Sequence, residues 1–247
     1  MAGRTFAIGD IHGDLVHLRK LLSRLPTLTA EDSLVFLGDY VDRGDASRQV
    51  VELMMVLRGF TSARVVCLRG NHEDAWLTVR ERGWVEFVVP ADNGCWDTLR
   101  SYLGKPARGS MPDRPDWEAL TSASFFPADH LAWMRALPCW YEDDHAIYVH
   151  AGLPRENGRF LHPSEVANPS PLLWQRDESF FREYEGKRVV CGHTPTESLP
   201  NELSTHTLDD PTDMWRRDPV VAVDTQCGRG GFLTAVELPA MRVYESR

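Results

Sequence analysis

Five short apolar runs recur along the chain, and each is followed by a polar residue. The runs are four or five residues long and rich in β-branched side chains, which is typical of strands that are buried on both faces of a sheet. They lie at residues 4–8, 33–37, 64–68, 146–149 and 188–191. Between the first three, apolar residues follow helical spacing over Leu15 to Leu25 and over Ser47 to Leu57. The alternation of strand and helix predicts an α/β fold with parallel strands.

Two segments depart from this alternation. Residues 84–143 are helical in pattern and rich in aromatic side chains, so we predict a helical insertion whose rings pack in the core or form a wall of the active site. Residues 198–219 carry several prolines and aspartates and are predicted to form an extended loop. Apolar runs at 219–223, 231–237 and 241–244 are predicted closing strands. We expect residues 1–247 to form one domain.

Composition narrows the possible partners. The chain has 247 residues, of which 43% are hydrophobic and 26% charged, with a net charge of −9. This charge disfavours nucleic acid as a partner, and no apolar run is long enough to predict a membrane span. The chain enters its first strand without a signal-like apolar core, which predicts a cytoplasmic protein. The five cysteines form no C-x-x-C pair and are expected to be buried small side chains.

Side chains that can bind metals follow all five strand-like runs. They are Asp10, His12, Asp39, Asn71, His150 and His193. Any one of them alone is explained as a turn former or helix cap. Because ligands gather outside the carboxyl ends of parallel strands, we expect the set to converge. Carboxylate and amide oxygens suit Mg²⁺ or Mn²⁺, and imidazoles shift the preference towards Mn²⁺, Fe²⁺ or Zn²⁺.

Five motifs, in order, carry a resemblance to a known family. They are GDIHG at 9–13, GDYVDRG at 38–44, LRGNHE at 68–73, HAG at 150–152 and CGHT at 191–194. The series resembles the phosphoprotein phosphatase (PPP) family of calcineurin-like metallophosphoesterases. The short chain and LLWQR at 172–176 resemble its bacterial and phage branch of serine/threonine protein phosphatases. The resemblance implies a four-layer α/β/β/α sandwich built from two mixed sheets.

The resemblance also implies two divalent metal ions at the ends of these strands. Mn²⁺ is the expected ion, with Fe, Zn and Mg as alternatives. The ligands would be divided as follows: Asp10 and His12 for the first ion, Asn71, His150 and His193 for the second, and Asp39 bridging both. Four further residues would act on the substrate. Arg43 and Arg176 would grip its phosphate, and His72, oriented by Asp42, would protonate the leaving oxygen.

The resemblance implies a phosphoesterase that hydrolyses phosphomonoesters, most of all phosphoserine and phosphothreonine on proteins. The reaction it implies is direct attack of a metal-bridging hydroxide on phosphorus. Hydrolysis of dinucleoside polyphosphates such as diadenosine tetraphosphate, or of other nucleotides, is the alternative, because hydrolases of that type share most of the motifs. The pair Asp42-Arg43 favours the phosphatase, since those hydrolases usually replace it. A non-catalytic metal-binding scaffold is disfavoured because every expected site residue is present.

Two details stay open at this stage. Residues 224–228 are expected to form a structural turn near the site, with substrate contact as the alternative. The sequence does not distinguish phosphotyrosine from phosphoserine and phosphothreonine as the preferred group, and it gives no oligomeric state.

Overall fold

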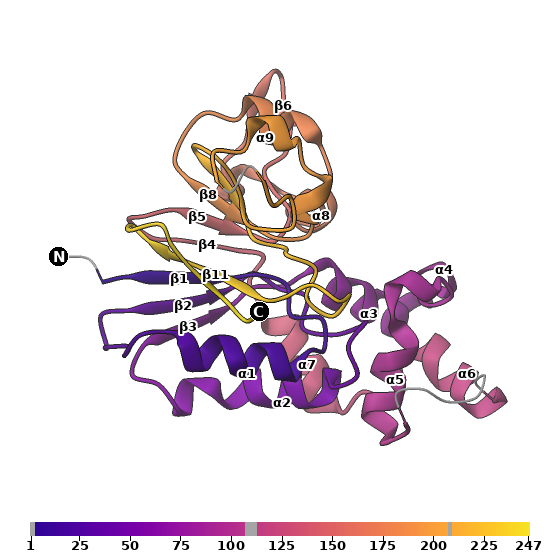
Figure 1. Ribbon diagram of the computed structural model, residues 1–247. Coiled ribbons are helices and arrows are strands. Elements are labelled where there is room, and N and C mark those ends of the chain that lie inside the picture. The colour runs from indigo at the N-terminus through magenta and orange to yellow at the C-terminus, as the bar shows by residue number, and fades with distance from the viewer. Residues whose placement is uncertain (1–2, 107–112, 207–208) are drawn as a thin grey trace.

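Two stacked β-sheets form the centre of the computed structural model, which describes residues 3–106, 113–206 and 209–247 (Figure 1). The first sheet has the strand order β12-β11-β1-β2-β3. Its strands are β1 (Thr5–Ile8), β2 (Ser33–Phe36), β3 (Arg64–Cys67), β11 (Thr234–Leu238) and β12 (Arg242–Glu245). The first three strands of the chain run parallel, whereas β11 pairs antiparallel with both β1 and β12. The sheet is therefore mixed.

The second sheet is mixed in the same way and has the order β4-β5-β8-β10-β9. Its strands are β4 (Trp140–Glu142), β5 (Ile147–Val149), β8 (Val189–Cys191), β9 (Trp215–Arg217) and β10 (Val220–Ala222). The central strands β5, β8 and β10 run parallel, and the two edge strands are antiparallel to their neighbours. A small hairpin, β6 (Arg155–Glu156) and β7 (Arg159–Phe160), stands apart from both sheets.

Strand alternation explains why these runs are apolar throughout. In β1, Phe6 and Ile8 pack into the hydrophobic cluster between the first sheet and its helices, whereas Ala7 packs into the cluster between the two sheets. In β8, Val189 faces the second helical layer and Val190 faces the inter-sheet cluster. β1 and β8 are buried on both faces, so an alternating polar pattern in them would leave polar groups without water.

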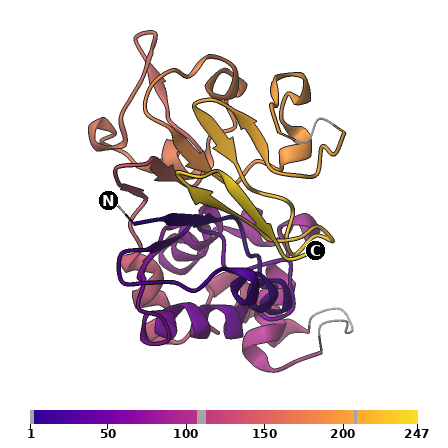
Figure 2. The ribbon, with the colours of Figure 1, turned by 60° about the vertical axis from the view of Figure 1, so that its left-hand side comes forward.

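Helices cover the outer face of each sheet and complete the four layers (Figure 2). Below the first sheet lie α1 (Leu15–Arg24), α2 (Ser47–Val56) and α7 (Ala128–Ala136), whereas α3 (Asn71–Arg82) lies beyond the carboxyl ends of its strands. Above the second lie the short helices α8 (Ser170–Trp174) and α9 (Glu178–Glu183). The start of α1 is fixed by Asp14, whose carboxylate accepts the amide of His17 at 2.9 Å. The predicted α/β class and its two mixed sheets are confirmed.

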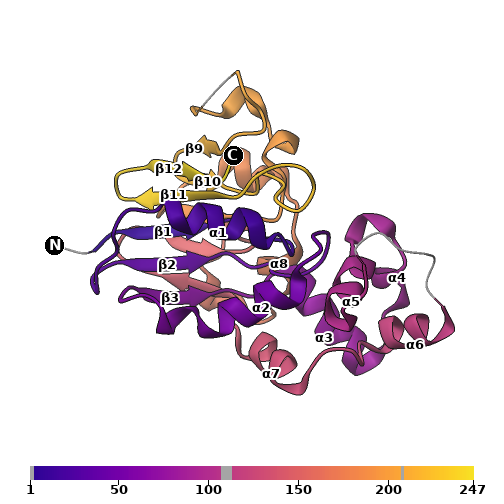
Figure 3. The same cartoon turned by 60° about the horizontal axis from the view of Figure 1, so that its bottom comes forward.

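The aromatic segment at 84–143 is helical over most of its described length. It forms α4 (Val85–Val88), α5 (Cys95–Leu103), α6 (Arg114–Ser122) and α7, with residues 107–112 outside the described structure. Helices α4, α5 and α6 cluster beyond the carboxyl ends of β1–β3 (Figure 3). Phe126 packs edge-on against Trp76 of α3, with ring centroids 5.2 Å apart. The end of the segment is strand β4 rather than helix, because residues 140–142 pair with β5.

The segment 198–219, predicted to be an extended loop, contains a strand that was not predicted because two of its three residues are charged. β9 lies in this stretch, together with short 3₁₀ turns at Thr196–Ser198 and Asn201–Leu203; residues 207–208 are outside the described structure. Its first residue, Trp215, is buried against Phe181, with ring centroids 5.6 Å apart. Arginines follow it at 216 and 217 because β9 is an edge strand. Other 3₁₀ turns lie at Leu57–Gly59, Ala91–Asn93 and Pro163–Glu165.

None of the helices in the described ranges has the length and apolar character that crossing a membrane would require.

Candidate metal centre

The carboxyl ends of five parallel strands bring the six metal-capable residues to one edge of the sandwich. Asp10 and His12 follow β1, Asp39 follows β2, Asn71 begins α3 after β3, His150 follows β5 and His193 follows β8. All six side chains are buried. Because β1–β3 belong to the first sheet and β5 and β8 to the second, the cluster exists only where the two sheets meet.

Asp39 stands at the centre of this cluster. One of its oxygens lies 3.3 Å from His12 Nε2, and the other lies 3.4 Å from His150 Nε2. Asp39 belongs to both groups of side chains whose ligand atoms are close enough to hold a metal ion: His12 with His72, and His150 with His193. Asp10 lies at the rim of the first group, with Oδ2 3.9 Å from His12 Nε2.

Backbone carbonyls set the tautomers of two histidines. His12 Nδ1 lies 3.0 Å from the Val41 carbonyl oxygen, and His150 Nδ1 lies 2.9 Å from the Leu37 carbonyl oxygen. A carbonyl only accepts, so we assign the proton to Nδ1 in both rings. Burial lowers the pKa of both imidazoles and keeps them neutral. The lone pair on each Nε2 therefore faces the Asp39 carboxylate, as metal-ligating histidines do.

The second half of the cluster has the same chemistry. Asn71 Oδ1 lies 2.9 Å from His150 Nε2 and 2.8 Å from His193 Nδ1. The amide oxygen and the His150 Nε2 are both acceptors, so their close approach is favourable only with a cation between them. His193 Nε2 is buried and has no hydrogen-bond partner among the described residues. These donor atoms fit a divalent ion.

Buried negative charge at the site also calls for a cation. Asp10, Asp39 and Asp224 are all buried there. Burial, followed by repulsion from Asp224 and Asp39, raises the pKa of Asp10 well above its usual range. Burial also raises the pKa of Asp224. For Asp39, burial acts in the same direction, but the nearby histidines and Arg43 outweigh it and hold its pKa below the usual value.

The backbone at the site is held in a conformation that side chains disfavour. His12, Asp39, Asp42, Arg43 and His193 all have positive φ angles, between 47° and 73°. Such residues concentrate at functional sites, where surrounding contacts hold the strain. Close approach adds a second constraint before His193. A Cβ on Gly192 would stand 2.0 Å from Asp10 Oδ1, so only glycine fits there.

His72 is held by a buried carboxylate beside the cluster. Its Nδ1 lies 2.6 Å from Asp42 Oδ2. Asp42 also accepts the indole N–H of Trp76 at 2.9 Å and the hydroxyl of Thr98 at 2.6 Å. These two partners could not be predicted from the sequence, because they come from α3 and α5 and meet Asp42 only through tertiary packing.

Glu73 joins two of the site loops from below. Its carboxylate accepts the backbone amides of Asp39 at 3.0 Å, Tyr40 at 2.8 Å and Gly70 at 3.0 Å. Burial raises its pKa to about 7. Glu73 is the last letter of the LRGNHE motif, but sequence reasoning assigned it no role. Its signal was its place at the third position of a helix, where a carboxylate reaches back to amides before the helix.

A pocket of about 390 Å³ opens over the cluster. Its lining includes Asn71, His72 and His193 together with three arginines, Arg43, Arg176 and Arg229, and none of its described lining residues is acidic. Arg43 contacts His12 Nε2, and its other terminal nitrogen lies 3.4 Å from His72 Nε2. Phe87 and Asn93 also line the pocket, so the aromatic segment contributes to the site as well as to the core.

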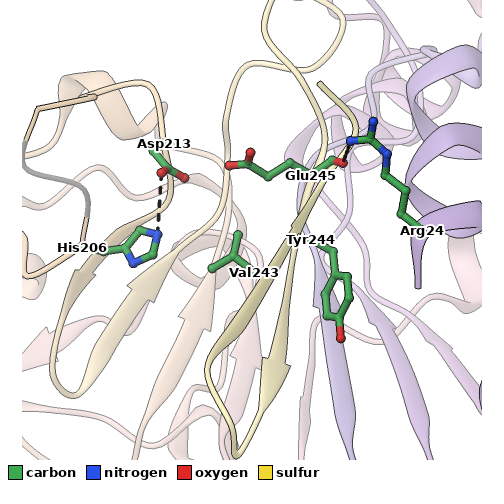
Figure 4. Close-up of a pocket in the computed structure, with 6 residues that line it drawn as sticks. All are labelled: Arg24, His206, Asp213, Val243, Tyr244 and Glu245. Atoms are coloured by element: carbon green, nitrogen blue, oxygen red, sulfur yellow. Dashed lines mark hydrogen bonds and ion pairs between the residues drawn. The ribbon is translucent and has the colours of Figure 1, made fainter. Parts of the chain in front are cut away.

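Another hollow, of about 410 Å³, shares no lining residue with this pocket (Figure 4). Strand β12 and helix α1 contribute to it, and His206 pairs there with Asp213, Nε2 to Oδ2 at 3.6 Å. Arg24 donates to the backbone oxygen of Glu245 at 2.5 Å. His206 matched no motif, and its pairing with Asp213 accounts for it without a metal.

The model of the calcineurin-like phosphoesterase family matches residues 3–197. The chain belongs to this family. Calcineurin-like phosphoesterases require divalent metals, and the two residue groups around Asp39 have the ligand atoms to hold them. The predicted resemblance is confirmed at the level of the family.

Relatives of this calcineurin-like phosphoesterase have different substrates in their names. The symmetrical bis(5'-nucleosyl)-tetraphosphatase of Dechloromonas aromatica is 32% identical over 98% of this chain and 95% of its own. The serine/threonine-protein phosphatase SIT4 of Candida albicans is 42% identical over 28% of this chain, which spans 23% of that relative. The cold-active protein-tyrosine phosphatase of a Shewanella species has the same fold: 17% identity, TM-score 0.56, covering 99% of this chain and 78% of that one.

Proposed function

We propose that this chain hydrolyses phosphomonoesters, with phosphoserine and phosphothreonine on proteins as its preferred substrates. The observation that carries this proposal is the hydrogen bond between His72 Nδ1 and Asp42 Oδ2, at 2.6 Å, for a histidine that lines the pocket together with Arg43. A histidine held in this way is suited to giving a proton to a departing oxygen. That step matters most for a serine or threonine alkoxide, which is a poor leaving group.

The metal ligands in this proposal are the six residues at the strand ends. Asp10 and His12 would hold one divalent ion, Asn71, His150 and His193 the other, and Asp39 both. Two such ions would supply a water activated for attack at phosphorus and would offset the charge of the phosphoryl group. Mn²⁺ is our expected ion. Asp39 is suited to the shared position because its two oxygens face His12 and His150 separately.

The substrate phosphate is held by arginines in the same proposal. Arg43 and Arg176 both line the pocket. A guanidinium presents two parallel donors to phosphoryl oxygens, and each such charge-assisted bond is stronger than a neutral one. His72 Nδ1–H is engaged by Asp42, so Nε2 is the atom that faces the pocket and delivers the proton. Asp42 keeps the ring in that orientation.

Symmetrical hydrolysis of dinucleoside tetraphosphates is the second candidate. Its support is the similarity to the Dechloromonas aromatica enzyme over nearly the whole length of both chains. Against it stands the chemistry of His72, since a departing nucleoside diphosphate needs little protonation. An internal phosphate also has fewer free oxygens for Arg43 and Arg176 than a terminal phosphate has.

A side-by-side assay with Mn²⁺ near neutral pH tests the choice. The substrates are phosphoserine, phosphothreonine and phosphotyrosine peptides, diadenosine tetraphosphate and p-nitrophenyl phosphate. We expect the phosphoserine or phosphothreonine peptides to have the highest kcat/KM among the natural esters. A preference for diadenosine tetraphosphate by about tenfold, which corresponds to 1.4 kcal/mol, would replace the first proposal by the second.

A further inference from the structure

A third arginine, Arg229, lines the pocket and has no part in the mechanism above. It lies in the turn between β10 and β11. The Gln226 carbonyl closes this turn by accepting the amides of Arg229 at 3.0 Å and of Gly231 at 3.1 Å. The turn begins within residues 224–228, which are predicted to form a structural turn, and Arg229 follows that segment directly. Because Arg229 lines the pocket over the candidate metal ligands, it is placed where it could contact the substrate.

Contacts on two sides hold the Arg229 head over the site. On one side the turn packs against the first ligand loop, because a Cβ on Gly228 would stand 2.6 Å from the His12 carbonyl oxygen. On the other side, Arg229 Nη2 donates to the backbone carbonyl of Asp92. The Asp92 loop is in turn joined to the site, since the amide of Arg43 donates to the Gly94 carbonyl at 3.3 Å.

The arginines of this pocket make no direct ion pair with a carboxylate of the described residues, although the buried Asp224 lies close enough to interact with Arg43 and Arg229. Most surface arginines, such as Arg182 and Arg216, do form such pairs. Burial and the neighbouring Arg43 lower the pKa of Arg229. Three guanidinium groups around one opening repel one another, and an anionic ligand relieves that repulsion.

We infer that Arg229 binds a second anionic group that lies beside the scissile phosphate. This inference rests on the proposed phosphoesterase function. A terminal phosphoryl group offers three free oxygens, and in the proposed function Arg43, Arg176 and the metal ions held at the strand ends would occupy them. The donors of Arg229 therefore serve a different group. Its chemistry is that of a carboxylate or phosphate, supplied by an acidic residue that flanks a phosphoserine or by the next phosphate of a polyphosphate chain.

Four substrates and three variants test this assignment in the Mn²⁺-loaded protein. The substrates are p-nitrophenyl phosphate, a phosphoserine peptide with neutral flanks, the same peptide with glutamate flanks, and diadenosine tetraphosphate. The variants are Arg229→Gln, Arg229→Lys and the matched control Arg19→Gln, which removes one exposed charge from α1. Activity on p-nitrophenyl phosphate also reports whether each variant is folded and metal-loaded.

We expect Arg229→Gln to lower kcat/KM by roughly tenfold or more for the parent's preferred doubly anionic substrate, as the loss of a charge-assisted hydrogen bond implies. Its activity on p-nitrophenyl phosphate and on the neutral peptide should stay within about twofold of the parent. Arg229→Lys should recover part of the loss, because the charge remains without the planar fork. Arg19→Gln should match the parent on every substrate.

The substrate on which the selective loss appears, flanked peptide or dinucleotide, identifies the source of the second anion. Equal losses on all four substrates, or no loss on any, would overturn the inference while leaving the proposed function standing. A parent protein that turns over none of the four would overturn both.

Discussion

Backbone strain at the site falls on the residues that would do the chemistry. His12, Asp39, Asp42, Arg43 and His193 adopt left-handed φ angles. Each such residue costs on the order of 1–3 kcal/mol when it is not glycine. The amides of Asp39 and Tyr40 donate to Glu73, and the amide of Asp42 donates to the Thr98 hydroxyl; these hydrogen bonds hold the loops in this state. The candidate ligand atoms are thereby held in place in the metal-free structure, so little reorganisation would accompany the proposed binding of metal or substrate.

Replacing Asp39 by Asn should abolish turnover and reduce the metal content. The variant keeps the shape of the side chain but removes the charge shared between the two groups of ligands. Metal analysis of the purified variant, with activity on p-nitrophenyl phosphate, measures both effects. Two tightly bound ions with normal turnover would contradict the bridging role. Asp116→Asn, on the surface helix α6, is the control and should match the parent.

Replacing His72 by Asn should leave the metals in place and lower kcat. We expect a loss of roughly 10²–10⁴-fold on a phosphoserine peptide, the usual contribution of a general acid. The loss on p-nitrophenyl phosphate should be smaller, because the phenolate departs with little help. Steady-state kinetics on both substrates give the ratio. Similar losses on the two would show that His72 does not act as the proton donor.

For individual residues, the sequence predicted the site loops but not the tertiary contacts that hold them. The six candidate ligand residues could be picked out because each follows a strand-like run, and the structure brings all six together. Trp76 and Thr98, which fix Asp42, could not, since their contact with it spans 34 and 56 residues of chain. Arg229 was missed for the same reason. Its turn reaches the pocket only because β10 and β11 lie in different sheets.

At the level of elements, a single carboxylate ties the start of β1 to the loop before β2. Asp32 accepts the amide, Nε and Nη2 of Arg4, at 3.1, 3.0 and 2.7 Å, and the amide of Thr29 at 2.8 Å. The hydrogen bonds from Arg4 hold the pKa of this buried carboxyl well below its usual value. Asp32 fixes the register in which Thr5 opposes Ser33, and hence where both site loops begin.

Replacing Asp32 by Asn should destabilise the protein by about 2 kcal/mol near neutral pH, through lost charge-assisted hydrogen bonds. A carboxyl with a lowered pKa contributes stability above its unfolded pKa, about 3.9, and loses it as pH falls towards the folded value. The difference between parent and variant should therefore shrink below about pH 4. Urea unfolding across this range measures it. Glu52→Gln, which breaks an exposed pair with Arg48, should change stability by less than about 1 kcal/mol.

Strand and helix predictions were correct where the spacing of apolar residues in the sequence matched the side chains that are buried in the structure. The parallel strands and the helices α1 and α2 were found because each has a complete apolar face. β9 was missed because Arg216 and Arg217 follow its one buried aromatic residue. The strand β4 was assigned to the helical segment before it, since Trp140 and Tyr141 continue that segment's aromatic composition. Pairing with β5 decides its conformation.

Over the whole molecule, the candidate metal centre lies at the junction of the two sheets. His150 and His193 come from the second sheet, and Asp10, His12 and Asp39 from the first. Ions bound there would hold the two sheets' loops together and offset the repulsion among buried carboxylates. Stability and metal occupancy should therefore be linked.

Removing metal with a chelator should lower the free energy of unfolding. For an ion present at about a thousandfold its Kd, the expected difference is about 4 kcal/mol. Thermal unfolding with and without added Mn²⁺ measures the effect as a shift in Tm. The Asp39→Asn variant serves as the control and should respond much less. Identical Tm values for loaded and chelated parent protein would rule out stabilisation by bound metal.

The pairing of β1 with β11 has a consequence for synthesis on the ribosome. Thr5 opposes Leu238, so one of the first strands to emerge waits for one of the last. Until β11 is synthesised, one edge of β1 in the nascent chain is unpaired. β1 is apolar on both faces, and unpaired apolar strand edges promote association with other chains. Contacts this distant in sequence also slow folding. Production of this protein should accordingly benefit from slower translation or from chaperones that shield open strands.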